Sequence, residues 1–370
     1  MSARFLTVVL ERAFNMRDGF GREIDYMRIS VIDSCNLNCY YCNPCDNNEH
    51  CHALNILSVK EVLCIVRAAT RLGIKHFRLT GGEPLLHPQL DEMVLQIKKI
   101  PGVSSVSLTT NAVLLAQHAK WLKEAGIDSI NVSLDTIDAS EYERITKKPL
   151  LEEVKHGINA AIECGIRVKI NVVLTPQTDV VALTRYVAKK GTDIRFIEMM
   201  PVGEGHTNGV EPYKKVIGTL SKLYGEPCRI NTEKTKEINS GNDKRKIPDN
   251  GPAEYYIFPE LGIRVGLIQA IHGKFCDTCN RIRVTADGRL MPCLGSSVTM
   301  DLVPDSWDFA DDVEKDFAIV RALRAAIKAK PRCHNFNDNA VTYTKITETK
   351  TTEIEAAEVN AARNMSRIGG

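Results

Sequence analysis

Three cysteines in the first part of the chain have the spacing of a metal site. Cys35, Cys39 and Cys42 form the pattern C-x3-C-x2-C, directly after an expected strand at Tyr26–Asp33. Soft thiolates gathered this closely are typical ligands of zinc or of an iron–sulfur cluster, and ordinary sites of both kinds use four protein ligands. A cluster held by only three cysteines would leave one iron open to a small molecule, which is a catalytic arrangement. The alternative is a structural zinc knuckle completed by one of the nearby residues Cys45, His50, Cys51 or His52.

A second cysteine triplet lies in the stretch FCDTCNRIRVTADGRLMPC. Cys276 and Cys279 form a CxxC pair, and Cys293 follows after thirteen intervening residues. Arg281 and Arg283 occupy alternate positions of an expected strand, so both side chains point to the same side and would hold an anionic nucleotide beside an open iron. A zinc site is the alternative here too, with the fourth ligand supplied by His272, Cys333 or His334.

The composition excludes several classes of function. The net charge of +2 gives no overall basic field, so neither nucleic acid nor a membrane surface is expected as a partner. No apolar run approaches the roughly 20 residues that a membrane helix needs. Twelve cysteines combined with no recognisable export signal favour a reducing cytoplasm, and therefore metal chemistry over disulfides.

Strands and helices alternate from residue 26 to about residue 200, which predicts an α/β fold. Six βα units in succession imply a parallel sheet, and right-handed crossovers would curl it into a partial (β/α)6 barrel. A closed eight-stranded barrel would need two more such units, and the sequence does not offer them. The expected strands after the first are His76–Thr80, Ser104–Thr109, Ser129–Leu134, Val168–Leu174 and Asp193–Glu198.

The remainder of the chain suggests four parts. Residues 1–25 form an N-terminal extension, 26–210 the barrel, 211–334 a C-terminal β-containing domain that carries the second cluster, and 335–370 a tail ending in Gly-Gly. Within the C-terminal domain, Ala253–Phe258 and Ile263–Ile268 are expected to form a hairpin, while the polar stretch Asn231–Gly251 is typical of a mobile connector.

Every chemically suggestive motif of the barrel follows a strand. The first cysteine triplet comes after the first strand, and Thr80–Pro84 (TGGEP), Thr109–Asn111 and Ser133–Asp135 come after the next three. Ligands of parallel α/β sheets bind at the carboxyl ends of the strands. The shared location therefore predicts one site, with the glycines of TGGEP allowing close approach of a ligand.

Four expected strands contain a cation. A charge on the helix-covered face of the sheet would be buried without water at high cost, so these side chains are expected to face the barrel interior. Together they favour a phosphate-bearing substrate, although each could instead pair with a carboxylate at a strand end. The four residues are Arg28, Arg78, Lys169 and Arg195.

The cysteine triplet with an aromatic residue before its last cysteine resembles the signature of the radical S-adenosylmethionine (SAM) superfamily. The segments CNLNCYYC, FRLTGGEPLL, INVSLD, IRFIEMMPVG and FCDTCNRIRVTADGRLMPCL, with a C-terminal Gly-Gly, resemble more narrowly the GTP 3′,8-cyclase family of molybdenum cofactor biosynthesis. The resemblance runs from about Tyr26 to Leu294. It implies a lyase with two 4Fe-4S clusters that uses SAM to generate a 5′-deoxyadenosyl radical, which takes hydrogen from C3′ of GTP so that C3′ bonds to C8 of the guanine.

The resemblance also assigns roles to residues. It implies that Cys35, Cys39 and Cys42 hold the first cluster and Cys276, Cys279 and Cys293 the second. The residues implied to contact SAM are Tyr41, Gly82, Glu83, Ser133 and Met200. Those implied to contact GTP are Arg28, Arg78, Thr109, Lys169, Arg281 and Arg283. Arg195, Gly369 and Gly370 are implied to reach into the active site as catalytic residues.

The same resemblance implies partners, and two other functions compete with it. The implied partners are the substrate GTP, a reductant such as flavodoxin or ferredoxin, and the downstream cyclic pyranopterin monophosphate synthase, and the chain would be compatible with a homodimer. The competing functions are a radical SAM enzyme of the same build acting on another substrate such as a peptide, and a zinc-stabilised nucleotide-binding module. Ser34 departs from the family, which has an arginine there.

Overall fold

The computed structural model describes residues 16–42, 55–201, 212–230, 251–296, 298–302, 312–334 and 336. Four groups of residues discussed above lie outside them: the Cys45–His52 cluster, residues 231–250 of the connector, most of the tail, and the terminal Gly369 and Gly370.

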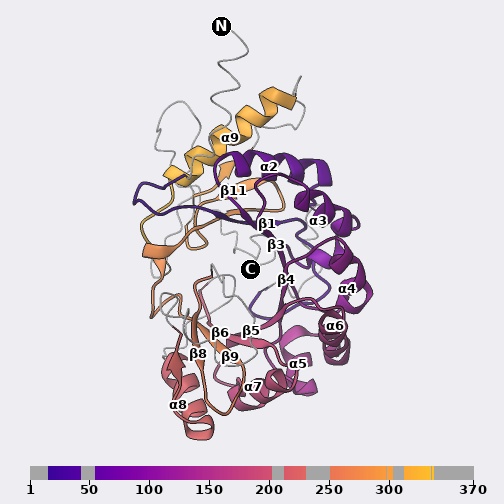
Figure 1. Cartoon of the computed structure of the whole chain (residues 1–370), viewed down its shortest axis with the longest axis vertical. Helices are drawn as coiled ribbons and strands as arrows, with labels where there is room; N and C mark the ends of the chain where they lie inside the picture. Colours follow the sequence, from indigo (N-terminus) through magenta and orange to yellow (C-terminus); the bar gives the residue numbers. More distant parts are fainter. Residues whose placement is uncertain are drawn as a thin grey trace.

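A single curved sheet of twelve strands organises the described chain (Figure 1). Its centre consists of six parallel strands in chain order, each linked to the next by helix, as the alternating pattern predicted. These strands are β1 (Tyr26–Ser30), β2 (His76–Thr80), β3 (Ser105–Thr110), β4 (Ser129–Ser133), β5 (Val168–Leu174) and β6 (Asp193–Glu198).

The helices lie along the outside of the sheet (Figure 1). Several begin at a side-chain cap: Ser58 and Glu61 form a complete capping box on α2 (Val59–Arg71), while Asp138 and Asp179 cap α5 (Ala139–Thr146) and α7 (Val180–Lys189). No helix in the described ranges is long and apolar enough to cross a membrane. The barrel helices are α2 (Val59–Arg71), α3 (Leu90–Lys98), α4 (Leu115–Glu124), α5 (Ala139–Thr146), α6 (Leu151–Glu163) and α7 (Val180–Lys189), with the 3₁₀ turn η2 at Pro84–Leu86.

The C-terminal half of the chain extends both edges of the central sheet. Strand β10 (Arg281–Val284) pairs in parallel with β1, and β9 (Arg264–Ile268) pairs in parallel with β6. Antiparallel strands continue each edge, and the helix α9 (Asp312–Lys328) packs on α2 (Figure 1). The remaining elements are α8 (Pro212–Tyr224), β7 (Cys228–Arg229), β8 (Glu254–Ile257), η3 (Cys276–Thr278), β11 (Arg289–Met291) and β12 (Met300–Asp301).

The two ends of the sheet do not pair with each other among the described strands, so the fold is an open barrel. The open sheet confirms the predicted partial barrel. Two parallel strands beyond the expected six are present, but they come from the distant C-terminal sequence, where periodicity alone could not place them beside β1 and β6.

The two faces of the sheet differ in polarity. Met27, Ile29, Phe77 and Leu79 point toward the helices and are completely buried, as are their counterparts on the other central strands. Parallel sheets covered on both sides are normally apolar on both. Here the inner face instead carries arginine, lysine, asparagine, serine and threonine, which indicates a wall built for a polar ligand.

Candidate active site

The first cysteine triplet lies in a loop at the carboxyl end of β1. The loop is tied to the end of α5 by hydrogen bonds from Asn38 N to Thr146 O (3.0 Å) and from Tyr40 N to Ile145 O (3.1 Å). Burial raises the pKa of the Cys39 thiol, and the neighbouring thiols of Cys42 and Cys35 and the carboxylate of Asp135 raise it further. Thiols that oppose one another's ionisation in this way ionise together only when a cation compensates them.

The TGGEP segment packs directly against this loop. Gly82 N donates to Ile32 O (2.7 Å), and Glu83 N donates to Ser34 O (2.8 Å). A Cβ at Gly82 would lie 2.2 Å from Ser34 O, and one at Gly81 would lie 2.6 Å from Ile32 O. The two glycines are therefore required for contact between backbone segments, whereas the sequence analysis assigned them to close approach of a ligand.

Glu83 links the second and third strand ends. Its buried carboxylate accepts hydrogen bonds from Thr110 Oγ1 (2.7 Å), Asn111 N (2.7 Å) and Leu85 N (3.0 Å), and burial raises its pKa to about 7. Asn111 in turn donates to Asn36 Oδ1 on the cysteine loop (2.7 Å). A carboxylate offers about four acceptor positions, so one remains for a ligand ammonium group.

Tyr41 is oriented by Asp135, an acidic residue that the sequence analysis placed in a motif after the fourth strand without assigning it a role. The phenol of Tyr41 donates to Asp135 Oδ2 (2.5 Å), and Val173 N donates to the other carboxylate oxygen (2.8 Å). Burial raises the pKa of Asp135 to about 6. Asp135 ends the INVSLD segment, so its position after a strand was the available signal.

Arginines from three adjacent strands lie side by side on the inner face of the sheet. Arg28 of β1 is in register with Arg78 of β2 on one side and with Arg283 of β10 on the other. Burial, followed by Arg283 and Arg78, lowers the pKa of Arg28 well below its usual value. Like charges packed together in a buried row are costly unless an anion joins them, and a polyphosphate supplies such an anion.

Tyr26 belongs to the same row and was missed in the sequence. Its phenol oxygen accepts a hydrogen bond from Arg78 Nε (2.5 Å). Burial opposes ionisation of Tyr26, but Arg78 and Arg28 outweigh it and lower the pKa of the phenol. The Arg78 guanidinium also donates to Leu108 O (3.2 Å) and Thr109 Oγ1 (3.4 Å), which places Thr109 beside the row.

Arg195 and Lys169 extend the cationic surface across β5 and β6, and both are about 4% exposed. Arg195 Nε donates to Asn171 Oδ1 (2.9 Å), while its Nη2 is buried with no hydrogen-bond partner among the described residues. Gly266 of β9 makes room for this side chain, because a Cβ there would lie 2.8 Å from Arg195 Cγ. The four strand cations thus lie on the inner face, as expected.

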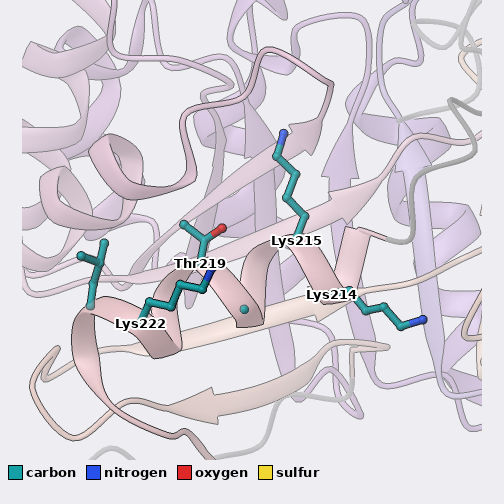
Figure 2. A pocket seen from close by; sticks show the side chains of 6 residues that line it. Lys214, Lys215, Thr219 and Lys222 are labelled. Carbon is teal, nitrogen blue, oxygen red and sulfur yellow. The ribbon is translucent and has the colours of Figure 1, made fainter.

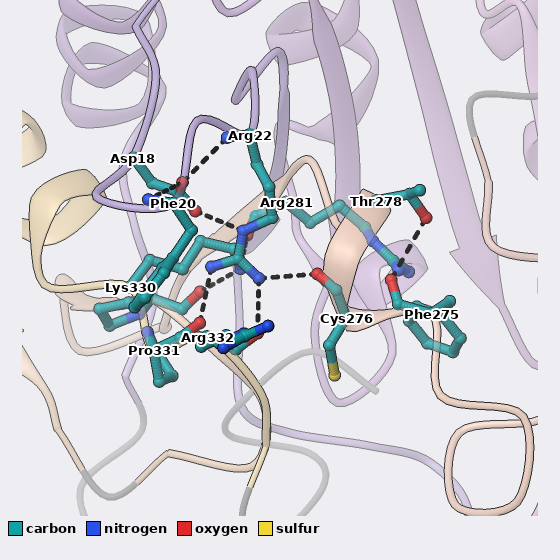
Figure 3. Close-up of polar contacts among 11 residues, drawn as sticks. Asp18, Phe20, Arg22, Phe275, Cys276, Thr278, Arg281, Lys330, Pro331 and Arg332 are labelled. Atoms are coloured by element: carbon teal, nitrogen blue, oxygen red, sulfur yellow. Dashed lines mark hydrogen bonds and ion pairs between the residues drawn. The ribbon is translucent and has the colours of Figure 1, made fainter.

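Cys276 and Cys279 of the second triplet lie in and just after η3, Cys293 follows β11, and all three cysteines are partly buried. Burial raises the pKa of Cys276, as do the thiols of Cys293 and Cys279. Burial also opposes ionisation of Cys279, but Arg281 and Lys330 outweigh it and lower the pKa of this thiol to about 7. The Arg281 guanidinium stacks over Phe275 at 4.9 Å (Figure 3).

The donors of both triplets fit an iron–sulfur cluster. Each set comprises soft thiols close enough to perturb one another's ionisation, and the first has N–H donors directed at sulfur, from Leu37 N (3.5 Å) and Asn111 Nδ2 (3.8 Å) to Cys35 Sγ. No three Cys, His, Asp or Glu side chains of the described chain are grouped so that they could hold a single metal ion. A cluster, whose cysteines each bind a different iron, does not require such a group.

Two of the residues expected to contact SAM lie at other strand ends. Ser133 ends β4 and is exposed on the inner side, opposite Asn171. Met200 follows β6 and packs against Met291, two residues before Cys293 of the second triplet. Met200 therefore lies where the barrel meets the C-terminal strands.

The Glu198–His272 pair was also missed in the sequence. Glu198, at the end of β6, accepts hydrogen bonds from Ile271 N (2.7 Å) and His272 N (3.2 Å), and its other oxygen contacts the His272 ring. This buried carboxylate orders the segment that leads into the second triplet. No sequence signal distinguished it from an ordinary glutamate at a strand end.

A surface groove on α8 lies apart from these residues (Figure 2). It has a volume of about 450 Å³ and is lined by Lys214, Lys215, Thr219 and Lys222, together with Gly218 and Leu223. It contains no cysteine and none of the inner-face cations, so the chemistry described here takes place elsewhere.

Comparisons with known proteins agree with this geometry. Residues 29–182 match the Radical SAM superfamily, and residues 192–336 match Molybdenum Cofactor Synthesis C. Among solved structures, Streptococcus suis SuiB bound to its precursor peptide SuiA is similar with a TM-score of 0.55 and 14% identity over 87% of this chain and 69% of that one. Native anSMEcpe with bound AdoMet is similar with a TM-score of 0.50 and 18% identity over 82% of this chain and 84% of that one. Fold and site together define a radical SAM enzyme that uses iron–sulfur clusters and SAM.

Curated relatives identify the family within that class. The GTP 3′,8-cyclase of Clostridium perfringens (strain SM101) is 35% identical over 87% of this chain and 95% of its own length. That of Peptoclostridium acidaminophilum is 37% identical over 87% of this chain and 94% of its own length. The chain belongs to the GTP 3′,8-cyclase family, whose enzymes are lyases of molybdenum cofactor biosynthesis.

Proposed function

We propose that this chain converts GTP to 3′,8-cyclo-7,8-dihydroguanosine 5′-triphosphate, the first step of molybdenum cofactor biosynthesis, and that the residues described above carry the reaction. The observation that supports this most strongly is the row Arg283, Arg28 and Arg78. It places three guanidinium groups side by side, on strands that connect directly to both cysteine loops. A triphosphate requires several cations at one place, and a peptide substrate does not.

Cys35, Cys39 and Cys42 would hold the first cluster, and Tyr41, Gly82, Glu83, Ser133 and Met200 would surround SAM beside it. When bound, this cluster would supply the electron that cleaves SAM, and the resulting 5′-deoxyadenosyl radical would take hydrogen from C3′ of GTP. The chain's own residues would orient SAM beside the cluster. Glu83 keeps an acceptor position for the methionine ammonium group, and Asp135 fixes the Tyr41 ring.

Arg28, Arg78, Thr109, Lys169, Arg281 and Arg283 would bind GTP. The arginine row accounts for the phosphates, because guanidinium forks match phosphate oxygens in geometry and charge. Lys169 and Arg195 face the same interior from the opposite side of the barrel. Arg195 Nη2, which has no partner among the described residues, would then donate to the substrate.

Cys276, Cys279 and Cys293 would hold the second cluster, whose open iron would bind the guanine. The strand that carries Arg281 and Arg283 begins two residues after Cys279, so the second cluster would lie next to the phosphate-binding row. Gly369 and Gly370 would thread into the site without side-chain clash. An interior lined on one side by the sheet would protect a carbon radical from water.

The remaining assignments follow from this function. The chain would work in the cytoplasm, receive electrons from a flavodoxin or ferredoxin, and pass its product to the cyclic pyranopterin monophosphate synthase. It would be divided into the extension 1–25, the barrel 26–210, the auxiliary-cluster domain 211–334 and the tail 335–370, and it would be able to form a homodimer.

A turnover experiment tests the function. The anaerobically reconstituted and reduced protein is incubated with SAM and GTP, and the products are identified by mass. Deoxyadenosine together with a cyclised nucleotide of the mass of GTP is the expected result. Deoxyadenosine without any GTP-derived product would point to another radical SAM substrate such as a peptide, and zinc without iron or sulfide would point to the nucleotide-binding module.

A further inference from the structure

Lys330 is a buried lysine that neither the sequence motifs nor the proposed function employs. It follows α9 and is 2% exposed. Its Nζ donates to Arg281 O (2.8 Å) and to Pro292 O (2.9 Å), and it lies close enough to Cys279 to help lower the pKa of that thiol. An ammonium group has three donors, and these two carbonyl oxygens occupy two of them.

The acceptors of Lys330 belong to the two segments that carry Cys279 and Cys293. Arg281 begins β10 two residues after Cys279, and Pro292 immediately precedes Cys293. The Lys330 Nζ atom therefore fixes the backbone next to Cys279 and the backbone next to Cys293. A residue that orients the segments carrying metal ligands determines whether their sulfurs converge on one cluster.

Arg22 performs the matching task for the third cysteine. It donates to Cys276 O (2.7 Å), and also to Pro331 O (2.6 Å) and Arg332 O (2.9 Å), while Asp18 neutralises its charge at 2.5 Å (Figure 3). Lys330 differs from Arg22 in this last respect. Among the described residues, no carboxylate lies within ion-pair distance of its Nζ.

An ammonium group buried without a counter-anion is expensive. Cys279 carries an acidic group beside Lys330, and a cluster held by thiolates would supply negative charge at this place. A positive charge beside a ligand sulfur stabilises the reduced, more negative state of a cluster and thereby raises its reduction potential.

We propose that Lys330 is a positioning residue of the second cluster. It holds the segments of Cys279 and Cys293 in place and shifts the potential of that cluster upward relative to one without the ammonium group. This inference rests on the proposed function, because it takes the second triplet to be a cluster site.

The test compares Lys330→Met, which keeps the length of the side chain and removes charge and donors, with Lys330→Gln, which keeps a donor and removes the charge. Lys328→Met is the matched control, since Lys328 is exposed and lies two residues earlier, at the end of α9. Iron and sulfide are counted in anaerobically reconstituted protein, and the midpoint potential of each cluster is measured by redox titration followed by electron paramagnetic resonance. The first cluster serves as an internal reference.

Both Lys330 variants are expected to show a more negative midpoint potential for the second cluster, with the first unchanged. A Lys330→Met protein that retains only the first cluster, with iron falling from about eight to about four per chain, would support the positioning role. If Lys330→Met does not fold, Lys330→Gln decides the question. Full iron content with unchanged potentials in the Lys330 variants, or the same shift in Lys328→Met, would overturn the inference. Wild-type protein with only four irons would instead refute the proposed function.

Discussion

Replacing Gly82 by alanine tests whether the TGGEP segment is what holds the first cysteine loop in place. The new Cβ would lie 2.2 Å from Ser34 O and 2.6 Å from Asp33 O, where ordinary contact begins at 3.4 Å. The loop would have to move by about 1 Å, and because both neighbouring groups are backbone, no side-chain rotation can relieve the clash. The two hydrogen bonds between the segments, Gly82 N to Ile32 O and Glu83 N to Ser34 O, would lengthen or break.

The cost of this change can be bounded. Overpacking of a tight contact costs about 1–3 kcal/mol, and each lost hydrogen bond costs about 0.5–1.5 kcal/mol. We therefore expect Gly82→Ala to lower the free energy of unfolding by roughly 2–6 kcal/mol, and to displace Cys35 enough to prevent assembly of the first cluster.

Chemical denaturation of the apo chain and iron analysis with electron paramagnetic resonance of the reconstituted chain measure the two effects. Gly218→Ala is the matched control, because Gly218 lies in α8 with nothing within 4 Å of the new Cβ. That variant should gain about 0.5–1 kcal/mol of stability and keep both clusters. A Gly82→Ala protein that assembles the first cluster as the wild type does would refute the reasoning.

Three further changes have directions that the structure fixes. Gly266→Ala would push Arg195 out of position and should weaken GTP binding about tenfold, the equivalent of about 1.4 kcal/mol; unchanged equilibrium binding to the holoenzyme would contradict this. Arg281→Ala should weaken GTP binding at least about tenfold, while SAM cleavage without substrate, measured as deoxyadenosine, should survive. The control Arg289→Ala, at an exposed position, should change neither property. Loss of both clusters in Arg281→Ala would mean that the arginine is structural. Burial raises the pKa of Glu83 from 4.5 in the free group to about 7 in the folded chain, so the folded chain binds the Glu83 proton more tightly than the unfolded chain does. The stability that this proton contributes is complete below about pH 4.5 and is lost as the pH rises through 7. Denaturation of the apo chain between pH 5 and 8 should show this loss of stability, of at most about 3 kcal/mol, and Glu83→Gln should remove it. If the stability of the wild type and of Glu83→Gln depended on pH in the same way, protonation of Glu83 would not be coupled to folding.

The sequence predicts the parts of this protein that local signals determine. Strand and helix positions from Tyr26 to Glu198 follow from periodicity and from caps such as Ser58 and Asp138. The cysteine triplets were visible because their spacing is local. The inward direction of Arg28 followed from the cost of burying a charge beneath a helix.

Features that depend on contacts between distant segments were not predicted. Nothing local indicates that β10 pairs with β1 or that β9 pairs with β6, since parallel register is set by packing over more than two hundred residues in the first case. For the same reason, Lys330 had no signal in the sequence. The sequence predicted that Gly82 allows close approach of a ligand, whereas its neighbours in the fold are backbone atoms of Asp33 and Ser34.

The account depends most on the claim that two iron–sulfur centres, each with an open iron, face one cationic interior. Electron paramagnetic resonance of the reduced protein, recorded alone, with SAM and with GTP, tests this directly. We predict two cluster signals, one that changes on addition of SAM and not of GTP, and one that changes on addition of GTP and not of SAM. A single cluster signal, or two signals that GTP leaves unchanged while it binds, would contradict it.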